Sequence, residues 1–136
     1  MWLQGLSRSG VGKVETYLSS LTMRASPALR ETLTMLRHLV LLRFKPTASA
    51  ADIGSIEAAF CALRTLVPGV CGLEWGTDVS PEGLAKGFTH AFMLSFADAA
   101  HRDAYLPHPA HQAFVAQLKP VLDDVLVLDY EVTGAG

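Results

Sequence analysis

The segment FTHAFMLSF, residues 88–96, is the strongest predicted strand in this chain of 136 residues. It is rich in aromatic and aliphatic side chains that favour β-strands, and neither proline nor glycine interrupts it. Because side chains alternate between the two faces of a strand, Phe92 and Phe96 lie on one face and Met93 on the other. Both faces of this predicted strand are therefore substantially apolar.

Three further strands are predicted on either side of this segment. Each is rich in β-forming residues and is bounded by proline, glycine or polar residues. The four predicted strands cover residues 37–44, 70–77, 88–96 and 125–132.

Helices are predicted in the two long connections. Ser49 is expected to cap a helix whose apolar side chains recur at spacings of three and four, and Pro68-Gly69 ends it. Asp98 caps a shorter helix that runs to about Tyr105, and a second helical segment starts near Pro109. The resulting order β-α-β-β-α-β is that of an α+β, ferredoxin-like domain with an antiparallel sheet.

Strand parity indicates that neither face of this sheet is polar. In the first strand Val40 and Leu42 oppose Leu39 and Leu41, and the last strand alternates in the same way. Two helices cover only one face of a four-stranded sheet, and an antiparallel sheet with its other face in water is polar there. We therefore expect that other face to pack on an identical chain, forming a homodimer.

Composition excludes several classes of protein. Half of the residues are apolar and 18% are charged, with a formal net charge of −2. No cluster of lysine and arginine indicates nucleic-acid binding, and no apolar run approaches the length of a membrane span. Cys61 and Cys71 form no disulfide framework and no metal-ligand spacing, so we expect two thiols in a reducing compartment, the cytoplasm.

The chain is predicted to divide into three parts. Residues 1–35 form an extension that is partly disordered or contains a short helix, and the absence of a hydrophobic stretch argues against a secretory signal. Residues 36–132 form the folded domain, and residues 133–136 form a tail.

Two histidines occur in phase with large apolar residues on predicted strands. A buried imidazole needs hydrogen-bond partners. His38 and His90 are therefore either two satisfied core histidines or members of one shared polar pocket. Asp129 interrupts the apolar last strand, and it either orients an imidazole or is the first residue there to reach water.

A second group of polar residues lies in the broken helix between residues 105 and 111. The segment carries the phenol of Tyr105 and the imidazoles of His108 and His111, and its irregular backbone could line a cavity. We expect His111 to be partly exposed. His108 is either a helix N-cap, a turn residue or, with His111 three residues further on, a metal ligand. No third ligand occurs at a recognisable spacing, so no metal site is predicted. His101 is expected on a solvated helix face.

The chain resembles the stress-responsive A/B barrel family over residues 36–132. The resemblance implies dimers of ferredoxin-like subunits that form an α+β barrel. The plant members include heat-stable proteins and a polyketide cyclase that closes a linear β-ketide thioester by aldol condensation without a cofactor. The segments that carry the resemblance are HLVLLRFK (38–45), WGTDVS (75–80), GFTH (87–90), YLPHPAH (105–111) and LVLDY (126–130).

The resemblance also implies a set of site residues. Tyr105 and His111 occupy the positions of the cyclase's Tyr–His pair, and His38 and His90 those of its pocket histidines. Asp129 occupies a matching acid position, and we add Phe92, in phase with His90, as a ligand contact. A neutral imidazole can remove a proton between two carbonyls, and a phenol can donate a hydrogen bond to the resulting oxyanion. No cofactor and no metal are expected.

Three functions remain open on this basis. One is a stress-associated dimer that binds a small molecule without turnover. A second is a cofactor-free cyclase, lyase or isomerase acting on a β-keto or polyketide-like compound, and a third is a monooxygenase-like or degradative role. Convergence of Tyr105, His111, His38 and His90 on one cavity favours the second function, whereas apolar side chains filling that space favour the first.

Overall fold

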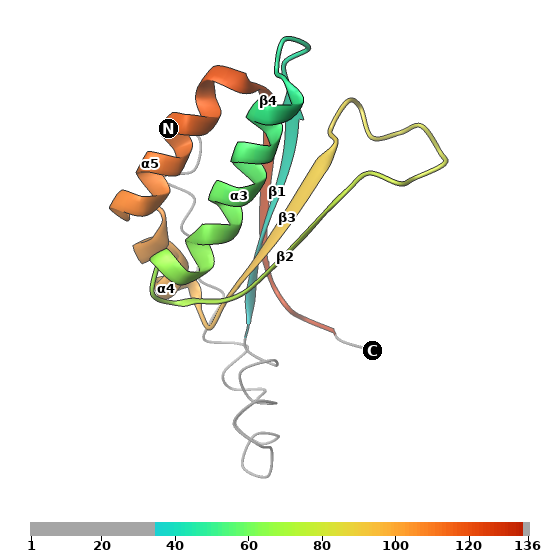
Figure 1. The fold of residues 1–136 in the computed structure, drawn as a ribbon. Helices are drawn as coiled ribbons and strands as arrows, with labels where there is room; N and C mark the ends of the chain where they lie inside the picture. Colours follow the sequence, from blue (N-terminus) through green and yellow to red (C-terminus); the bar gives the residue numbers. More distant parts are fainter. Residues whose placement is uncertain (1–34, 135–136) are drawn as a thin grey trace.

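A computed structural model describes residues 35–134 of the chain (Figure 1). The predicted extension up to residue 34 and the last two residues of the tail lie outside this range. The described elements follow the predicted order β-α-β-β-α-β, with the second helical connection in two parts. They are β1 (Leu36–Phe44), α3 (Ala50–Leu66), β2 (Val70–Thr77), β3 (His90–Phe96), α4 (Ala99–Tyr105), α5 (Pro109–Leu118), the 3₁₀ turn η1 (Lys119–Val121) and β4 (Leu122–Glu131).

The four strands form one antiparallel sheet in the order β2-β3-β1-β4. Figure 1 shows α3, α4 and α5 together on one side of this sheet. The arrangement confirms the ferredoxin-like α+β fold. Strands β1 and β3 are central, so their side chains on the helix side are enclosed by neighbours in every direction.

Helix α3 begins with a reciprocal cap. The Ser49 hydroxyl accepts from the Asp52 backbone N–H at 3.0 Å, and the Asp52 carboxylate accepts from the Ser49 N–H at 3.0 Å. This capping box satisfies two amides that have no partner inside the helix.

Helix α3 has 17 residues. No helix within residues 35–134 is long and apolar enough to cross a membrane.

The two last strands differ from the predicted boundaries. Strand β3 begins at His90, and Phe88 lies before it instead of continuing its alternation. Lys86 and Gly87 have positive φ angles of 56° and 83°, so the chain is still turning there. Phe88 packs instead beneath the Arg43 guanidinium, 5.3 Å from its ring centroid. Strand β4 begins at Leu122 and not at the predicted residue 125, because the 3₁₀ turn η1 ends at Val121 and the strand follows it directly.

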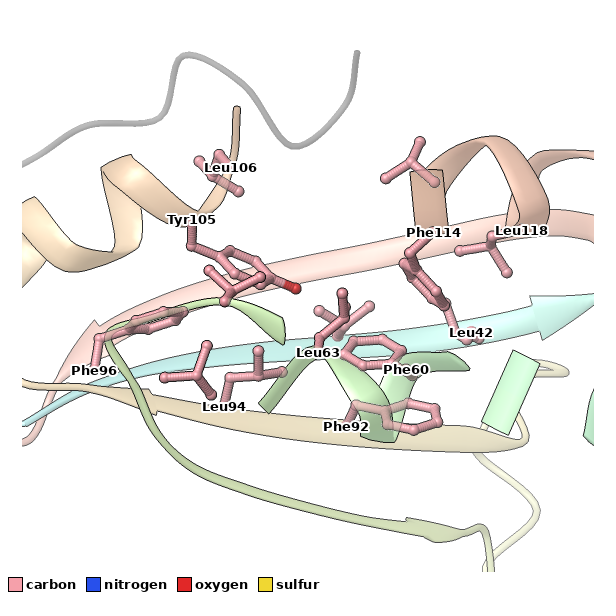
Figure 2. Close-up of a cluster of buried hydrophobic side chains, with 14 of the residues drawn as sticks. Leu42, Phe60, Leu63, Phe92, Leu94, Phe96, Tyr105, Leu106, Phe114 and Leu118 are labelled. Atoms are coloured by element: carbon pink, nitrogen blue, oxygen red, sulfur yellow. The ribbon is translucent and has the colours of Figure 1, made fainter. Parts of the chain in front are cut away.

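The core lies between the sheet and the helices, as Figure 2 shows. Phe92 of β3 stacks on Phe60 of α3, with ring centroids 4.0 Å apart and planes 2° apart. Phe114 of α5 packs against the same Phe60 ring at 4.7 Å. Burial of such aromatic rings contributes about 2 kcal/mol or more each, so this stack is a main attachment of the helices to the sheet.

The opposite face of the sheet is also apolar, as strand parity predicts. Leu126, Leu128 and Tyr130 are exposed there by 43%, 55% and 44%. Leu41 and Leu39 of β1 lie opposite Leu126 and Leu128 in the antiparallel register, which places all of them on this face. No helix covers them within residues 35–134. We call this surface the open face.

Candidate functional site

The break between α4 and α5 determines the position of His111. Helix α5 begins at Pro109, and His108 caps it by accepting the Ala110 backbone N–H at its Nδ1, 3.1 Å away. The Leu106 carbonyl does not receive the Ala110 amide that a continuous helix would supply. It accepts instead from Nδ1 of His111 at 2.8 Å. His108 is therefore a helix cap, one of the roles predicted for it.

Tyr105 lies between two imidazoles. Its ring centroid is 4.5 Å from that of His111 and 5.9 Å from that of His38. The side chain is 1% exposed, and burial raises the pKa of the phenol. Because the neutral form is favoured, Tyr105 presents an O–H donor at every ordinary pH.

His111 is buried, whereas the sequence analysis expected it to be partly exposed. The side chain is 1% exposed because the broken helix turns it inward against Tyr105. Burial lowers the pKa of His111, and this effect outweighs the hydrogen bond to the Leu106 carbonyl, which favours the protonated ring. Its Nδ1 donates to the Leu106 carbonyl, so in the neutral ring Nε2 carries the lone pair. His111 can therefore act as a base at neutral pH.

His38 is oriented by Asp129 from the neighbouring strand. The two residues are register partners across β1 and β4, and Nδ1 of His38 lies 2.6 Å from Oδ1 of Asp129. An ionised carboxylate only accepts hydrogen bonds, so Nδ1 carries a proton. The opposite ring nitrogen, Nε2, is buried and has no hydrogen-bond partner among residues 35–134. Asp129 thus orients an imidazole, one of the two predicted alternatives.

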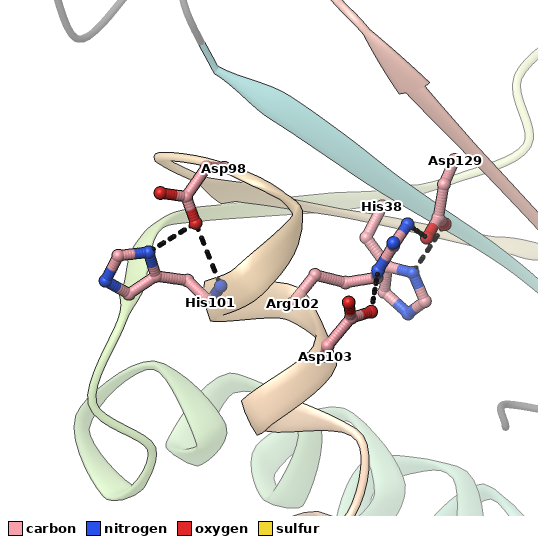
Figure 3. Close-up of polar contacts among 6 residues, drawn as sticks. All are labelled: His38, Asp98, His101, Arg102, Asp103 and Asp129. Carbon is pink, nitrogen blue, oxygen red and sulfur yellow. Dashed lines mark hydrogen bonds and ion pairs between the residues drawn. The ribbon is translucent and has the colours of Figure 1, made fainter. Parts of the chain in front are cut away.

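The structure adds Arg102 to this group, a residue that the sequence analysis missed. Its Nη1 donates to Oδ2 of Asp129 at 2.8 Å, and its Nε donates to Oδ1 of Asp103 at 3.0 Å (Figure 3). Burial opposes ionisation of Asp129, but its hydrogen bonds and charge contacts with His38 and Arg102 outweigh burial and lower the pKa of the carboxyl. An available signal was the spacing of Arg102 and Tyr105, three residues apart on one helical face.

His38, Tyr105, His111, Asp129 and Arg102 thus form one connected group, which we call the Tyr105 cluster. It combines a phenol, an imidazole base, and an imidazole held by an ion pair, drawn from β1, β4, α4 and α5. A broad groove of about 430 Å³ runs along β4 beside it, with Arg102, Asp129 and Tyr130 in its walls. Its size is that of a site for a small organic molecule.

His90 lies apart from the Tyr105 cluster. It pairs with Leu42 in the sheet, four residues along β1 from His38, so the two residues are offset by about 13 Å along the strand direction. Its Nε2 contacts Glu57 at 2.9 Å, its Nδ1 contacts the Thr89 hydroxyl at 2.8 Å, and Trp75 stacks over it. His90 is thus a satisfied histidine beside a separate hollow of about 320 Å³.

The space between the two groups is filled by apolar side chains. Phe92, which the sequence analysis assigned to the ligand site, is fully buried and stacked on Phe60. The rings of Tyr105, His111 and His38 therefore lie together in the core, whereas His90 lies apart from them. The predicted convergence on one cavity open to solvent stays a prediction. The ligand-binding roles of His90 and Phe92 stay predictions.

The fifth histidine is on the solvated side of α4, as predicted. His101 contacts the Asp98 carboxylate at 2.6 Å, and the same carboxylate caps the helix by accepting the His101 N–H at 2.9 Å. Figure 3 shows this pair apart from the His38–Asp129–Arg102 contacts. Within residues 35–134, no group of three or more His, Cys, Asp or Glu side chains could hold a metal ion.

Two curated proteins are similar to this chain over most of their lengths. The stress-response A/B barrel domain-containing protein HS1 of Arabidopsis thaliana is 35% identical over 97 residues, which are 71% of this chain and 89% of that protein. Olivetolic acid cyclase of Cannabis sativa is 27% identical over 94 residues, 69% of this chain and 93% of the cyclase.

Solved structures show the same similarity. A hydroxynitrile lyase from Passiflora edulis superposes with a TM-score of 0.71 at 30% identity, covering 76% of this chain and 97% of the lyase. A dimeric ferredoxin-like protein of unknown function from Jannaschia sp. gives a TM-score of 0.64 at 30% identity, covering 72% of this chain and 99% of that protein.

The family model of the stress responsive A/B barrel domain matches residues 36–132. This range contains every described helix and strand and all residues of the Tyr105 cluster. Relatives of this kind include enzymes, such as the cyclase and the lyase, and proteins of unknown function. The chain therefore belongs to the stress responsive A/B barrel domain family.

Proposed function

We propose that this protein binds a small carbonyl compound at the Tyr105 cluster. The observation that carries the proposal is Nε2 of His38, which is buried without a hydrogen-bond partner among residues 35–134. Such an atom lowers stability unless a ligand or water satisfies it. Tyr105, whose ring lies beside His38, supplies a donor O–H, and Nε2 of His38 supplies an acceptor when the ring is neutral. A ligand with both a hydroxyl and a carbonyl oxygen, such as the enol of a 1,3-dicarbonyl compound, complements both groups.

A second candidate function is turnover by acid–base chemistry without a cofactor. His111 is a buried base with a lowered pKa, and its ring packs against a phenol that burial keeps protonated. These two groups are what the addition to a carbonyl group, or its reversal, requires. The cyclase and lyase among the similar proteins support this candidate. In this reading His111 takes a proton from the attacking nucleophile and returns it to the oxygen of the new hydroxyl group, and the reversal runs through the same transfers in the opposite order. Tyr105 donates a hydrogen bond to the carbonyl oxygen as it becomes negative.

We also propose that two copies associate through the open face. The exposed apolar side chains of Leu126, Leu128 and Tyr130 form a continuous surface with half-buried Leu39 and Leu41. A second copy would bring an identical apolar surface against it, and the dimeric relative from Jannaschia supports this partner.

Cys61 and Cys71 are free thiols, which fits the reducing environment of the cytoplasm.

A titration tests the ligand proposal. Benzoylacetone, which is largely an enol, is added to isotopically labelled protein, and the imidazole signals of His38 and His111 are followed by NMR. The matched compound 4-phenylbutan-2-one has the same carbon skeleton and only one carbonyl group. We expect saturable shifts with benzoylacetone alone, and their loss in Tyr105→Phe. Equal responses to both compounds, or shifts only at His90, would contradict the proposal.

A turnover assay separates the two candidate functions. Mandelonitrile, a cyanohydrin, is incubated with the protein, and release of benzaldehyde is followed by its absorbance. Catalysis by a positioned base predicts a loss of about 10²-fold or more in His111→Gln. His101→Gln, at the exposed face of α4, is the matched control and should retain the full rate. Binding of benzoylacetone without turnover of mandelonitrile or of a β-keto thioester supports the first candidate alone.

A further inference from the structure

Arg102 is a buried cation with an unusual position. It is 3% exposed, yet it lies on the short helix α4, whose other buried side chains are Ala99 and Tyr105. A buried guanidinium needs opposite charges close to it. Nε and Nη1 of Arg102 are hydrogen-bonded, whereas Nη2 is buried and has no partner among residues 35–134. The contacts of Arg102 with Asp129 and Asp103 supply the opposite charges.

We propose that Arg102 is a positioning residue of the ligand site, which holds the Asp129 carboxylate in the orientation that fixes the His38 ring and its tautomer. This inference rests on the proposed function, because it takes His38 as a group that meets the ligand. The proposed effect of Arg102 on His38 is transmitted through Asp129.

The two carboxylate oxygens of Asp129 accept hydrogen bonds from two different residues. Oδ1 of Asp129 accepts from His38 on β1 at 2.6 Å, and Oδ2 accepts from Arg102 on α4 at 2.8 Å. Asp129 is on β4, so three elements meet at one carboxylate. Rotation of the carboxylate would break both bonds together. Without Arg102, only one bond to a single ring would oppose that rotation.

The guanidinium is in turn fixed in its plane. Nε donates to Asp103 and Nη1 donates to Asp129, so two different edges of the planar group are held by two carboxylates. A lysine ammonium is a point charge without this fixed fork of donors. The geometry therefore depends on an arginine and not only on a positive charge.

The consequence for His38 is chemical. A carboxylate at Nδ1 requires a proton on that nitrogen, which in the neutral ring leaves Nε2 as a bare acceptor directed away from Asp129. If the carboxylate turned away, the proton could move to Nε2, and the ring would offer a donor where it now offers an acceptor. A ligand hydroxyl would then lose its partner. Arg102 thus determines which kind of ligand atom His38 accepts.

The test reads the tautomer directly. Arg102→Met removes the charge and all donors but keeps a long apolar side chain, and Arg64→Met, at an exposed position of α3, is the matched control. Long-range ¹H–¹⁵N spectra give the shifts of both His38 ring nitrogens, with assignment by His38→Gln. We expect well-separated shifts in the wild type and in Arg64→Met, with Nδ1 protonated. In Arg102→Met the two shifts should move toward each other.

A second pair of variants covers the case in which Arg102→Met does not fold. Arg102→Lys keeps the charge without the fork, and we expect it to shift the His38 nitrogens in the same direction. Asp129→Asn removes the link between Arg102 and His38, so adding Arg102→Lys to it should change the His38 spectrum no further. Wild-type His38 shifts in a folded Arg102 variant would overturn the proposal, as would additive effects in the double variant.

The affinity for benzoylacetone separates this inference from the proposed function. We expect at least a tenfold weaker affinity in Arg102→Lys and no change in Arg64→Met. If the wild type binds no benzoylacetone, the proposed function fails, whereas the tautomer measurement still decides the role of Arg102. If the tautomer is lost but affinity is unchanged, the control of ligand binding by Arg102 is refuted.

Discussion

His38 and Asp129 face each other across β1 and β4, and their side chains form a hydrogen bond of 2.6 Å on the helix side of the sheet. The bond joins residues that are 91 positions apart in the chain. It places an ionised group in the protein interior, where Arg102 balances its charge. Stability and site geometry therefore depend on the same three side chains.

Replacement of Asp129 should be costly. Asp129→Asn leaves the buried Arg102 guanidinium without one of its two carboxylates, and breaking a buried pair from one side costs about 3 kcal/mol or more. The free energy of unfolding, measured with urea, should fall by this amount. The matched control is Asp123→Asn, which breaks the exposed pair with Arg43 and should cost less than about 1 kcal/mol. Similar losses in both variants would contradict the prediction.

The pH dependence of stability should change in His111→Gln. Folding lowers the pKa of His111, mainly through burial. Below pH ~6.5, His111 therefore binds a proton in the unfolded chain while it is still neutral in the folded protein. The free energy of unfolding should therefore be highest above this pH. It should decrease as the pH falls toward the pKa that His111 has in the folded state. Urea unfolding at pH 7.5, 6.5 and 5.5 should show a flatter profile in His111→Gln. An unchanged slope would show that another group is responsible.

Phe92 can be assigned to the core or to the ligand site by two variants. Phe92→Ala should lower the free energy of unfolding by about 3–5 kcal/mol because it empties the stack on Phe60. Phe92→Leu keeps most of the apolar volume, so it should lose less stability and retain the wild-type affinity for benzoylacetone. A folded Phe92→Leu protein that no longer binds benzoylacetone would show that Phe92 contacts the ligand.

The assembly should depend on the open face. We expect light scattering to give twice the chain mass of 14.6 kDa for the wild type. Leu128→Lys places a charge in the middle of the open face, and burial of an unpaired charge is unfavourable, so this variant should be a monomer. Val79→Lys, at a position 90% exposed in the β2–β3 loop, should remain a dimer. A monomeric wild type would remove the proposed partner of the open face.

Local sequence signals predicted the elements well but not all of their ends. Ser49 and Asp98 cap α3 and α4 as predicted, because capping depends on atoms within three residues. The start of β3 was placed two residues too early. Phe88 has the composition of a strand residue, but the positive φ angles before it and the contact with Arg43 hold it outside the strand. That contact comes from another strand, so no local pattern reports it.

The candidate site was predicted in part for a similar reason. Strand parity placed His38 on the buried face, and the last strand showed one acid, but the sequence did not show that these two residues are register partners. His90 has the same parity as His38 across the sheet, yet it lies at the other end of the core with Glu57. Parity defines the face of a side chain and not its position along the strand.

The order of elements, the helix caps and the apolar character of both sheet faces follow from the sequence alone, since these features depend on neighbours within a few residues. The contact of Arg102 with Asp129 and the burial of His111 against Tyr105 become visible only in the folded chain. These contacts join α4 to β4 and bring α5 against α4. Their existence depends on strand register and on the angle of a broken helix, and long-range packing sets both.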